Sequence, residues 1–159
     1  MARLLIVYHS RTGGTEQMAK AAYEAAQPEA ETLLLRAETA SPEDLLSADG
    51  YIFAGPENLA ALSGAMKEFF DRAYYPVLGK LEGRPYAHLI CAGSDGENAA
   101  RQLARIATGW RLKAVQQPLI VNTQAQTEAE ILAPKTISES DLDNCREIGA
   151  ALAACSSLG

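Results

Sequence analysis

The stretch Leu4–Met18, LLIVYHSRTGGTEQM, decides the fold of this chain. Its first five residues are all apolar, which is typical of a strand buried on both faces of a parallel sheet. The six residues after His9 carry hydroxyl groups or are glycine, with the exception of Arg11. Apolar residues then recur at helical spacing, at Met18, Ala21 and Ala22. The order of strand, polar turn and helix predicts a βα unit whose turn binds a ligand.

The polar turn predicts an anion site. The first N–H groups of a helix have no partner within it, and the helix dipole adds partial positive charge there. The turn contains no lysine and matches neither GxxxxGK[ST] nor GxGxxG, which favours a single terminal monophosphate over a triphosphate with magnesium. An ordinary βα turn with a threonine N-cap is the alternative. The residues predicted to bind the anion are Ser10, Arg11, Thr12, Gly13, Gly14 and Thr15.

Length and composition predict a single domain over residues 1–159. The formal net charge of −6 argues against nucleic acid or an anionic membrane as partner. No apolar run approaches membrane-spanning length, and the sequence begins with a core strand rather than a signal peptide, so we expect a cytoplasmic protein. Three cysteines without CxxC spacing are expected to be reduced thiols, and with only two histidines no metal site is expected.

Strand-like and helix-like segments alternate along the chain. This rhythm predicts an α/β three-layer sandwich with a five-stranded parallel sheet in the order 2-1-3-4-5. Ligands of such sheets bind beyond the carboxyl ends of the strands, where the loops 9–15, 55–62 and 92–97 would meet. Residues 124–135 are expected to form a polar loop with one turn around Ile131. The expected strands are 4–8, 32–36, 51–54, 85–92 and a strand within 111–121.

Three motifs carry a family resemblance. The turn Ser10–Thr15 after a hydrophobic strand resembles the FMN-phosphate loop of the flavodoxin-like flavoproteins. Residues 49–56 (DGYIFAGP) and 62–72 (LSGAMKEFFDR) are similar to a stretch of the FMN-containing NAD(P)H and quinone reductases, and 93–96 (GSDG) is similar to their third flavin loop. The resemblance implies a flavodoxin-like fold with FMN as cofactor. The residues it places at FMN are the six of the polar turn together with Pro56, Glu57, Asn58, Leu59, Ala60, Gly93, Ser94, Asp95 and Gly96.

The resemblance also implies an activity. The flavin would pass a hydride from NADH or NADPH to a quinone, a flavin or a similar small acceptor, with no catalytic side chain. The segment 57–61 (ENLAA) departs from the family pattern, and neither it nor the third loop contains an aromatic residue that could cover the flavin ring. One ring face would then be open to a second molecule. A one-electron carrier for a partner protein, and a binding domain that has lost FMN, remain alternatives.

Several other residues have expected places. His9 is expected to shape the phosphate loop, with a proton relay as its alternative role. Asn58 either contacts the pyrimidine edge of the flavin or is a turn residue. Trp110 is expected to cover the sheet edge. Tyr74 and Tyr75 are expected at the surface, where the pair would suit a homodimer interface.

Overall fold

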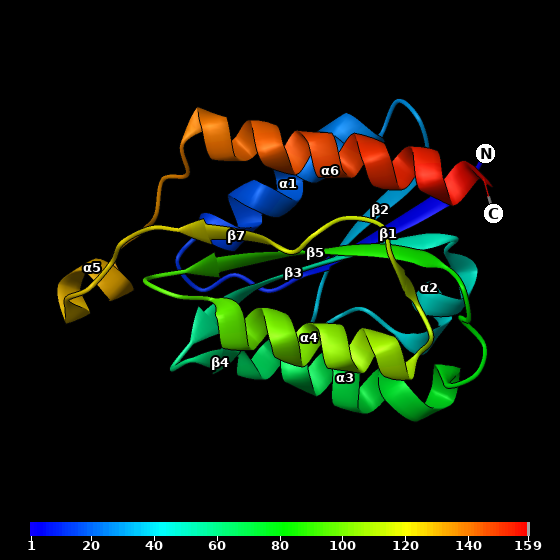
Figure 1. The fold of residues 1–159 in the computed structure, drawn as a ribbon, viewed down its shortest axis with the longest axis horizontal. Helices are drawn as coiled ribbons and strands as arrows, with labels where there is room; N and C mark the ends of the chain where they lie inside the picture. The colour runs from blue at the N-terminus through cyan, green and yellow to red at the C-terminus, as the bar shows by residue number, and fades with distance from the viewer. Residues whose placement is uncertain (159) are drawn as a thin grey trace.

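A mainly parallel sheet lies between two layers of helices in the computed structural model, which describes residues 1–158 (Figure 1). The expected three-layer α/β architecture is confirmed. The strands are β1 Arg3–Tyr8, β2 Glu31–Arg36, β3 Gly50–Asn58, β4 Ala61–Leu62, β5 Pro85–Ala92, β6 Lys113–Ala114 and β7 Leu119–Asn122. The helices are α1 Gly14–Ala26, α2 Pro42–Ser47, α3 Gly64–Val77, α4 Glu97–Gly109, α5 Glu128–Leu132 and α6 Glu139–Leu158.

The strand order is β2-β1-β3-β5-β6, with β7 also parallel to β5 and the short β4 antiparallel to β3. This is the predicted order 2-1-3-4-5, except that the fifth strand is divided into β6 and β7. The interruption includes Pro118, which has no N–H to donate to a strand ladder. The single strand expected within 111–121 is therefore two short strands that pair with opposite ends of β5.

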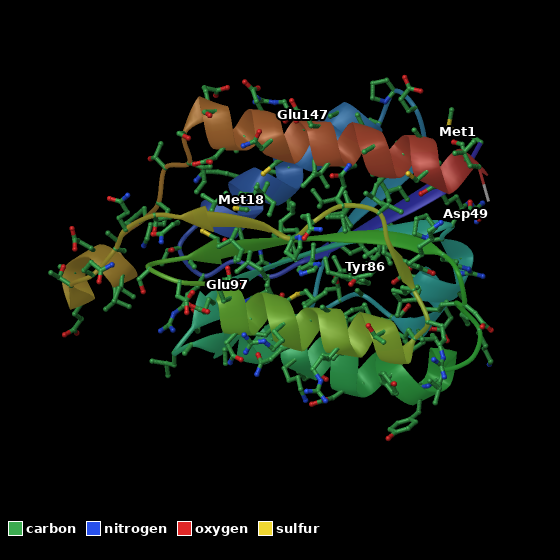
Figure 2. All side chains as sticks on the ribbon, viewed as in Figure 1. Met1, Met18, Asp49, Tyr86, Glu97 and Glu147 are labelled. Atoms are coloured by element: carbon green, nitrogen blue, oxygen red, sulfur yellow. The ribbon has the colours of Figure 1, made fainter. Side chains whose placement is uncertain are left out.

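Helices α1 and α6 cover one face of the sheet, and α3 and α4 cover the other (Figure 1). The backbones of α1 and α6 approach closely, because a methyl group on Gly149 would lie 2.1 Å from the carbonyl oxygen of Ala22. Both chain ends lie at the end of the molecule opposite α5 (Figure 1). Figure 2 shows the same polarity, with Glu97 at the start of α4 toward the α5 end and Asp49 at the opposite end.

The position expected for Trp110 was wrong. Its side chain is fully buried, and its ring centroid lies 5.7 Å from those of Phe70 and Tyr74. The indole N–H donates to the carbonyl of Tyr74 at 3.1 Å, so full burial leaves no polar group of the ring unpaired. Tyr75 is well exposed, as expected. Tyr74 is partly buried by its stacking on Trp110, so the expected surface pair is only half at the surface.

Candidate functional site

The turn between β1 and α1 adopts a conformation that its glycines require. Gly13 is the N-cap of α1 with a φ of +95°, and its N–H donates to the Ser10 hydroxyl at 3.1 Å. A methyl group on Gly14 would lie 2.7 Å from the Cys91 sulfur, so α1 can begin this close to β5 only without a side chain there. The alternative of a threonine N-cap is wrong, because Gly13 occupies the cap and no side chain caps the helix.

Thr15 carries the clearest sign of a ligand. The residue is 2% exposed, and within residues 1–158 its hydroxyl makes no hydrogen bond to an oxygen or nitrogen; its one polar neighbour is the weakly bonding thiol of Cys91. A buried hydroxyl without a partner costs about 1–3 kcal/mol. It lies in the first turn of α1, where the backbone N–H groups also lack partners within the helix. An anion with several acceptor oxygens would satisfy both kinds of donor.

His9 connects the turn Ser10–Thr15, called the anion loop from here on, with the neighbouring strand β3 and helix α3. Its backbone N–H donates to Ala54 at 3.1 Å, and its Nδ1 lies 2.9 Å from the Ser63 hydroxyl. Burial lowers the pKa of His9, which favours a neutral ring. Ser63 is the N-cap residue of α3 but makes no capping hydrogen bond with its side chain, which faces His9 instead. These contacts support the expected role of His9 in shaping the loop.

The second expected loop is largely a β-hairpin. β3 continues to Asn58, and Glu57 and Asn58 pair with β4. Leu59 and Ala60 form the tip, with φ values of +53° and +63°. Two-residue hairpin turns of this kind usually contain Asn-Gly, so Leu-Ala gave no turn signal and the hairpin was missed. The expectation of a loop over 55–62 was wrong in this respect.

The third loop matches its expected place at the carboxyl end of β5. Gly96 is the N-cap of α4 with a φ of +92°. The Asp95 carboxylate accepts the Glu97 N–H at 3.4 Å, a contact within the turn that leads into α4. A methyl group on Gly93 would lie 2.8 Å from the carbonyl oxygen of Ala125, so this loop packs against the chain that follows β7.

A shallow cleft, open to solvent, lies where the three loops meet. The structure thus brings together residues that are far apart in the sequence. Ser10, Gly13, Gly14 and Thr15 belong to the turn that borders the cleft, while Leu59 and Ala60 form the hairpin tip and are not part of its lining. Ser94, Asp95 and Gly96 continue the third loop beyond the lining. The predicted residues that line the cleft are Arg11, Thr12, Pro56, Glu57, Asn58 and Gly93.

Two features of the cleft have chemical consequences. One carboxylate oxygen of Glu57 is buried without a hydrogen-bond partner in the described chain, so it is a free acceptor at the cleft wall. Cys91 also lines the cleft, but burial raises the pKa of its thiol to about 11. A neutral thiol is a weak nucleophile, so Cys91 is a wall residue rather than a reactive one.

Five lining residues were not predicted: Cys91, Ala125, Ile131, Leu132 and Lys135. The last three come from α5 and the segment after it, which is hydrogen-bonded to the turn Ser10–Thr15 through the N–H of Lys135 and the carbonyl of Thr12. The polar turn contains no lysine, but Lys135 places its Nζ 3.3 Å from the Thr12 hydroxyl. A capping box formed by Thr127 and Glu130 starts α5, and this spacing was the one local signal of the helix.

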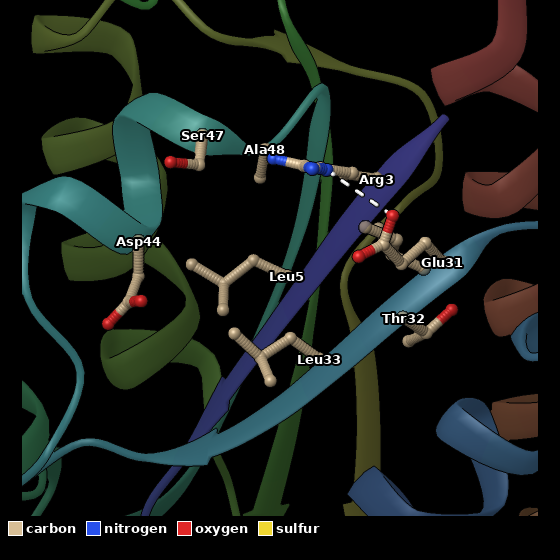
Figure 3. Close-up of a pocket in the computed structure, with 9 residues that line it drawn as sticks. Arg3, Leu5, Glu31, Thr32, Leu33, Asp44, Ser47 and Ala48 are labelled. Carbon is tan, nitrogen blue, oxygen red and sulfur yellow. Dashed lines mark hydrogen bonds and ion pairs between the residues drawn. The ribbon is translucent and has the colours of Figure 1, made fainter. Parts of the chain in front are cut away.

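A second hollow lies beside β1, β2 and α2 (Figure 3). Its charged side chains already have partners. Arg3 pairs with Glu31 at 3.3 Å, and Asp44 accepts from Ser41 in the capping box of α2. Leu33 leaves an exposed apolar surface there. The hollow therefore lacks the unpaired polar groups found at the cleft.

Within residues 1–158, no helix combines the length and the apolar composition needed to cross a membrane. Over the same residues, no group of three or more His, Cys, Asp or Glu side chains is placed to hold a metal ion.

Solved structures confirm the fold class. A flavodoxin, WrbA-like protein from Agrobacterium tumefaciens superposes with a TM-score of 0.74 at 23% identity, covering 99% of both chains. Oxidised flavodoxin 1 from Bacillus cereus superposes with a TM-score of 0.75 at 20% identity, covering 96% of this chain and 98% of its own. The protein is therefore an α/β protein of flavodoxin-like fold.

The family follows from sequence comparison. The model of the NADPH-dependent FMN reductase family matches residues 38–127, more than half of the chain, and the chain belongs to this family. This match includes the second and third loops but neither the anion loop nor Lys135.

Curated relatives also match over part of the chain. A flavodoxin from Aquifex aeolicus is 37% identical over 97 residues, which are 60% of this chain and 50% of the relative. An NAD(P)H dehydrogenase (quinone) from Acidithiobacillus ferrooxidans is 38% identical over 94 residues, 45% of this chain and 47% of the relative. The chain spans about half the length of these relatives.

Proposed function

We propose that the cleft binds FMN and that the protein is an NAD(P)H-dependent reductase. It would pass a hydride from NADH or NADPH to a quinone, a flavin or a similar small acceptor in the cytoplasm. The observation that carries the proposal is the buried, unpartnered hydroxyl of Thr15 at the start of α1, beside a cleft at the carboxyl ends of the strands. Family membership and the relative named NAD(P)H dehydrogenase (quinone) support it.

The residues of the anion loop fit a phosphate monoester. The hydroxyls of Thr12 and Thr15 and the first N–H groups of α1 are donors, and a phosphate presents only acceptors. Ser10 holds the turn in shape through its contact with Gly13. The anion loop would therefore hold the 5′-phosphate by oriented donors.

The opposite wall fits the polar edge of a flavin ring. Such an edge presents one N–H donor and carbonyl acceptors, and the free carboxylate oxygen of Glu57 is a suitable acceptor for the N–H. The side-chain amide of Asn58 lines the same cleft and can donate to a carbonyl. Gly93 lines the same cleft, and its close approach to the Ala125 carbonyl sets the wall on that side. FMN would supply the redox chemistry, while these residues bind and orient it.

The lining of the cleft favours a reductase over a carrier. No aromatic side chain lines the cleft in the described part of the chain, so neither ring face would be covered by stacking. A hydride donor must contact the ring directly, which an open face allows. A one-electron carrier for a partner protein is the second candidate, favoured by the relative named flavodoxin. The unpartnered Thr15 hydroxyl counts against the loss of FMN.

Anaerobic rapid mixing with NADH and with NADPH tests the activity. The FMN-loaded protein should lose its visible flavin absorbance much faster than free FMN at the same concentration, and a quinone should restore it. Reduction no faster than that of free FMN would overturn the reductase assignment and leave the carrier. Failure of the protein to bind FMN would overturn both candidates.

A further inference from the structure

The segment 133–137, between α5 and α6, is bound to the anion loop by its backbone. The N–H of Lys135 donates to the carbonyl of Thr12 at 2.9 Å. The Gln17 side chain of α1 donates to the carbonyl of Lys135 at 2.7 Å and accepts the N–H of Ile137 at 3.0 Å. These three hydrogen bonds fix the backbone on both sides of Lys135. The backbone of Lys135 is therefore held at a fixed position beside the anion loop.

The side chain of Lys135 extends along the same loop. Its Nζ lies 3.3 Å from the Thr12 hydroxyl, and it donates to the carbonyls of Ile131 at 2.9 Å and Ala133 at 2.6 Å. The residue is half-buried and lines the cleft. Among residues 1–158, no carboxylate lies within ion-pair distance of it. The ammonium group thus has only neutral oxygens as partners.

An ammonium group at this point changes the electrostatics of the anion loop. Apart from Arg11, which lines the cleft, the turn Ser10–Thr15 offers only the partial charges of its hydroxyls and of the helix N-terminus to a phosphate that carries close to two full negative charges. A hydrogen bond between two ionised groups is about twice as strong as one between neutral groups. The field of Lys135 already reaches the cleft wall, where it opposes the rise in the Cys91 pKa that burial causes.

We propose that Lys135 is a phosphate-binding residue that selects 5′-phosphorylated flavin over the uncharged riboflavin. This inference rests on the proposed binding of FMN. The lysine reaches the phosphate site from 123 residues beyond Thr12 in the sequence. It keeps Thr12 as a partner while its contacts with the two carbonyls are exchanged for phosphate oxygens. Selection for the phosphate would then depend on a segment outside the family-model match at 38–127.

Equilibrium titrations with FMN and with riboflavin, followed by flavin fluorescence, test this role. In Lys135→Met the dissociation constant for FMN should rise about ten- to hundredfold, whereas that for riboflavin should stay unchanged. Lys135→Arg should retain most of the preference for FMN. Lys113→Met is the control, because Lys113 likewise has no ion pair within residues 1–158 but is exposed on β6, at the opposite end of β5. It should bind both flavins as the unmodified protein does.

The outcomes separate this inference from the proposed function. If the unmodified protein binds FMN tightly and Lys135→Met binds it equally well, the role of Lys135 is overturned while the FMN site stands. Equal losses for FMN and riboflavin would also overturn it, because they would reflect damage to the cleft. If the unmodified protein does not bind FMN, both the site and the role of Lys135 are overturned.

Discussion

Replacing Thr15 by valine should stabilise the FMN-free protein and at the same time weaken FMN binding. Valine has nearly the shape of threonine but carries a methyl group in place of the hydroxyl. The hydroxyl is buried with only the weakly bonding Cys91 thiol beside it, so its removal should raise the free energy of unfolding by about 1 kcal/mol. A hydrogen bond to a charged phosphate contributes about 1.5–3 kcal/mol, so the dissociation constant for FMN should rise about ten- to hundredfold. The same substitution thus removes a cost in the FMN-free protein and a favourable contact in the FMN complex.

Urea unfolding without FMN and fluorescence titration with FMN measure the two effects. Thr32→Val is the matched control, because the Thr32 hydroxyl donates to the carbonyl of Ala30 at 3.0 Å, far from the cleft. It should lower the free energy of unfolding by about 1 kcal/mol and leave FMN affinity unchanged. If Thr15→Val loses stability as Thr32→Val does and binds FMN as before, the hydroxyl is not held for a phosphate.

Three further predictions concern stability, each measured as the free energy of unfolding in urea. Burial lowers the pKa of His88 from 6.5 to about 4, so the folded protein resists protonation of this ring while the unfolded chain does not. The free energy of unfolding should therefore fall by up to about 3 kcal/mol as the pH drops from 6.5 to 4. The same dependence of unfolding free energy on pH in His88→Leu would contradict this. Gly149→Ala should lower the free energy of unfolding by about 1–3 kcal/mol, because its methyl group would clash with the backbone of α1 at Ala22. Gly64→Ala is the control and should not destabilise the protein, because its methyl group would meet nothing within 4 Å. Equal effects of the two substitutions would refute the close contact between α1 and α6. Ala60→Gly should raise the free energy of unfolding by about 0.5–1 kcal/mol, because Ala60 has a left-handed conformation that glycine adopts without strain. Ala61→Gly, at the first residue of β4, should not raise it.

Most of the fold could be predicted from the sequence because the buried strands are continuous apolar runs. Residues 4–8 and 85–92 read as strands without tertiary information, and both are strands in the structure. The errors have local causes. Pro118 divides the last strand, and the Leu59-Ala60 turn lacks the Asn-Gly signal of a tight hairpin. Trp110 was expected over the sheet edge, but packing places its ring in the core, 6.4 Å from that of Phe53 on the middle strand β3.

The candidate site could be predicted only where its parts are local in sequence. The anion loop occupies six consecutive residues, and the topology brings the three loops to one end of the sheet. Lys135 could not be predicted, because nothing in its neighbourhood in the sequence connects it with Thr12. Only the path of the chain after β7 brings the two residues together. The unpartnered hydroxyl of Thr15 likewise becomes visible only once the packing around it is known.

A crystal structure of the protein grown with FMN would test the central claim most directly, because it locates both ends of the cofactor. We predict the phosphate against the turn Ser10–Thr15, within hydrogen-bond distance of the Thr15 hydroxyl, and the ring beside Glu57 and Gly93. FMN bound elsewhere, for example in the hollow beside Leu33, with the Thr15 hydroxyl still unpartnered, would contradict it.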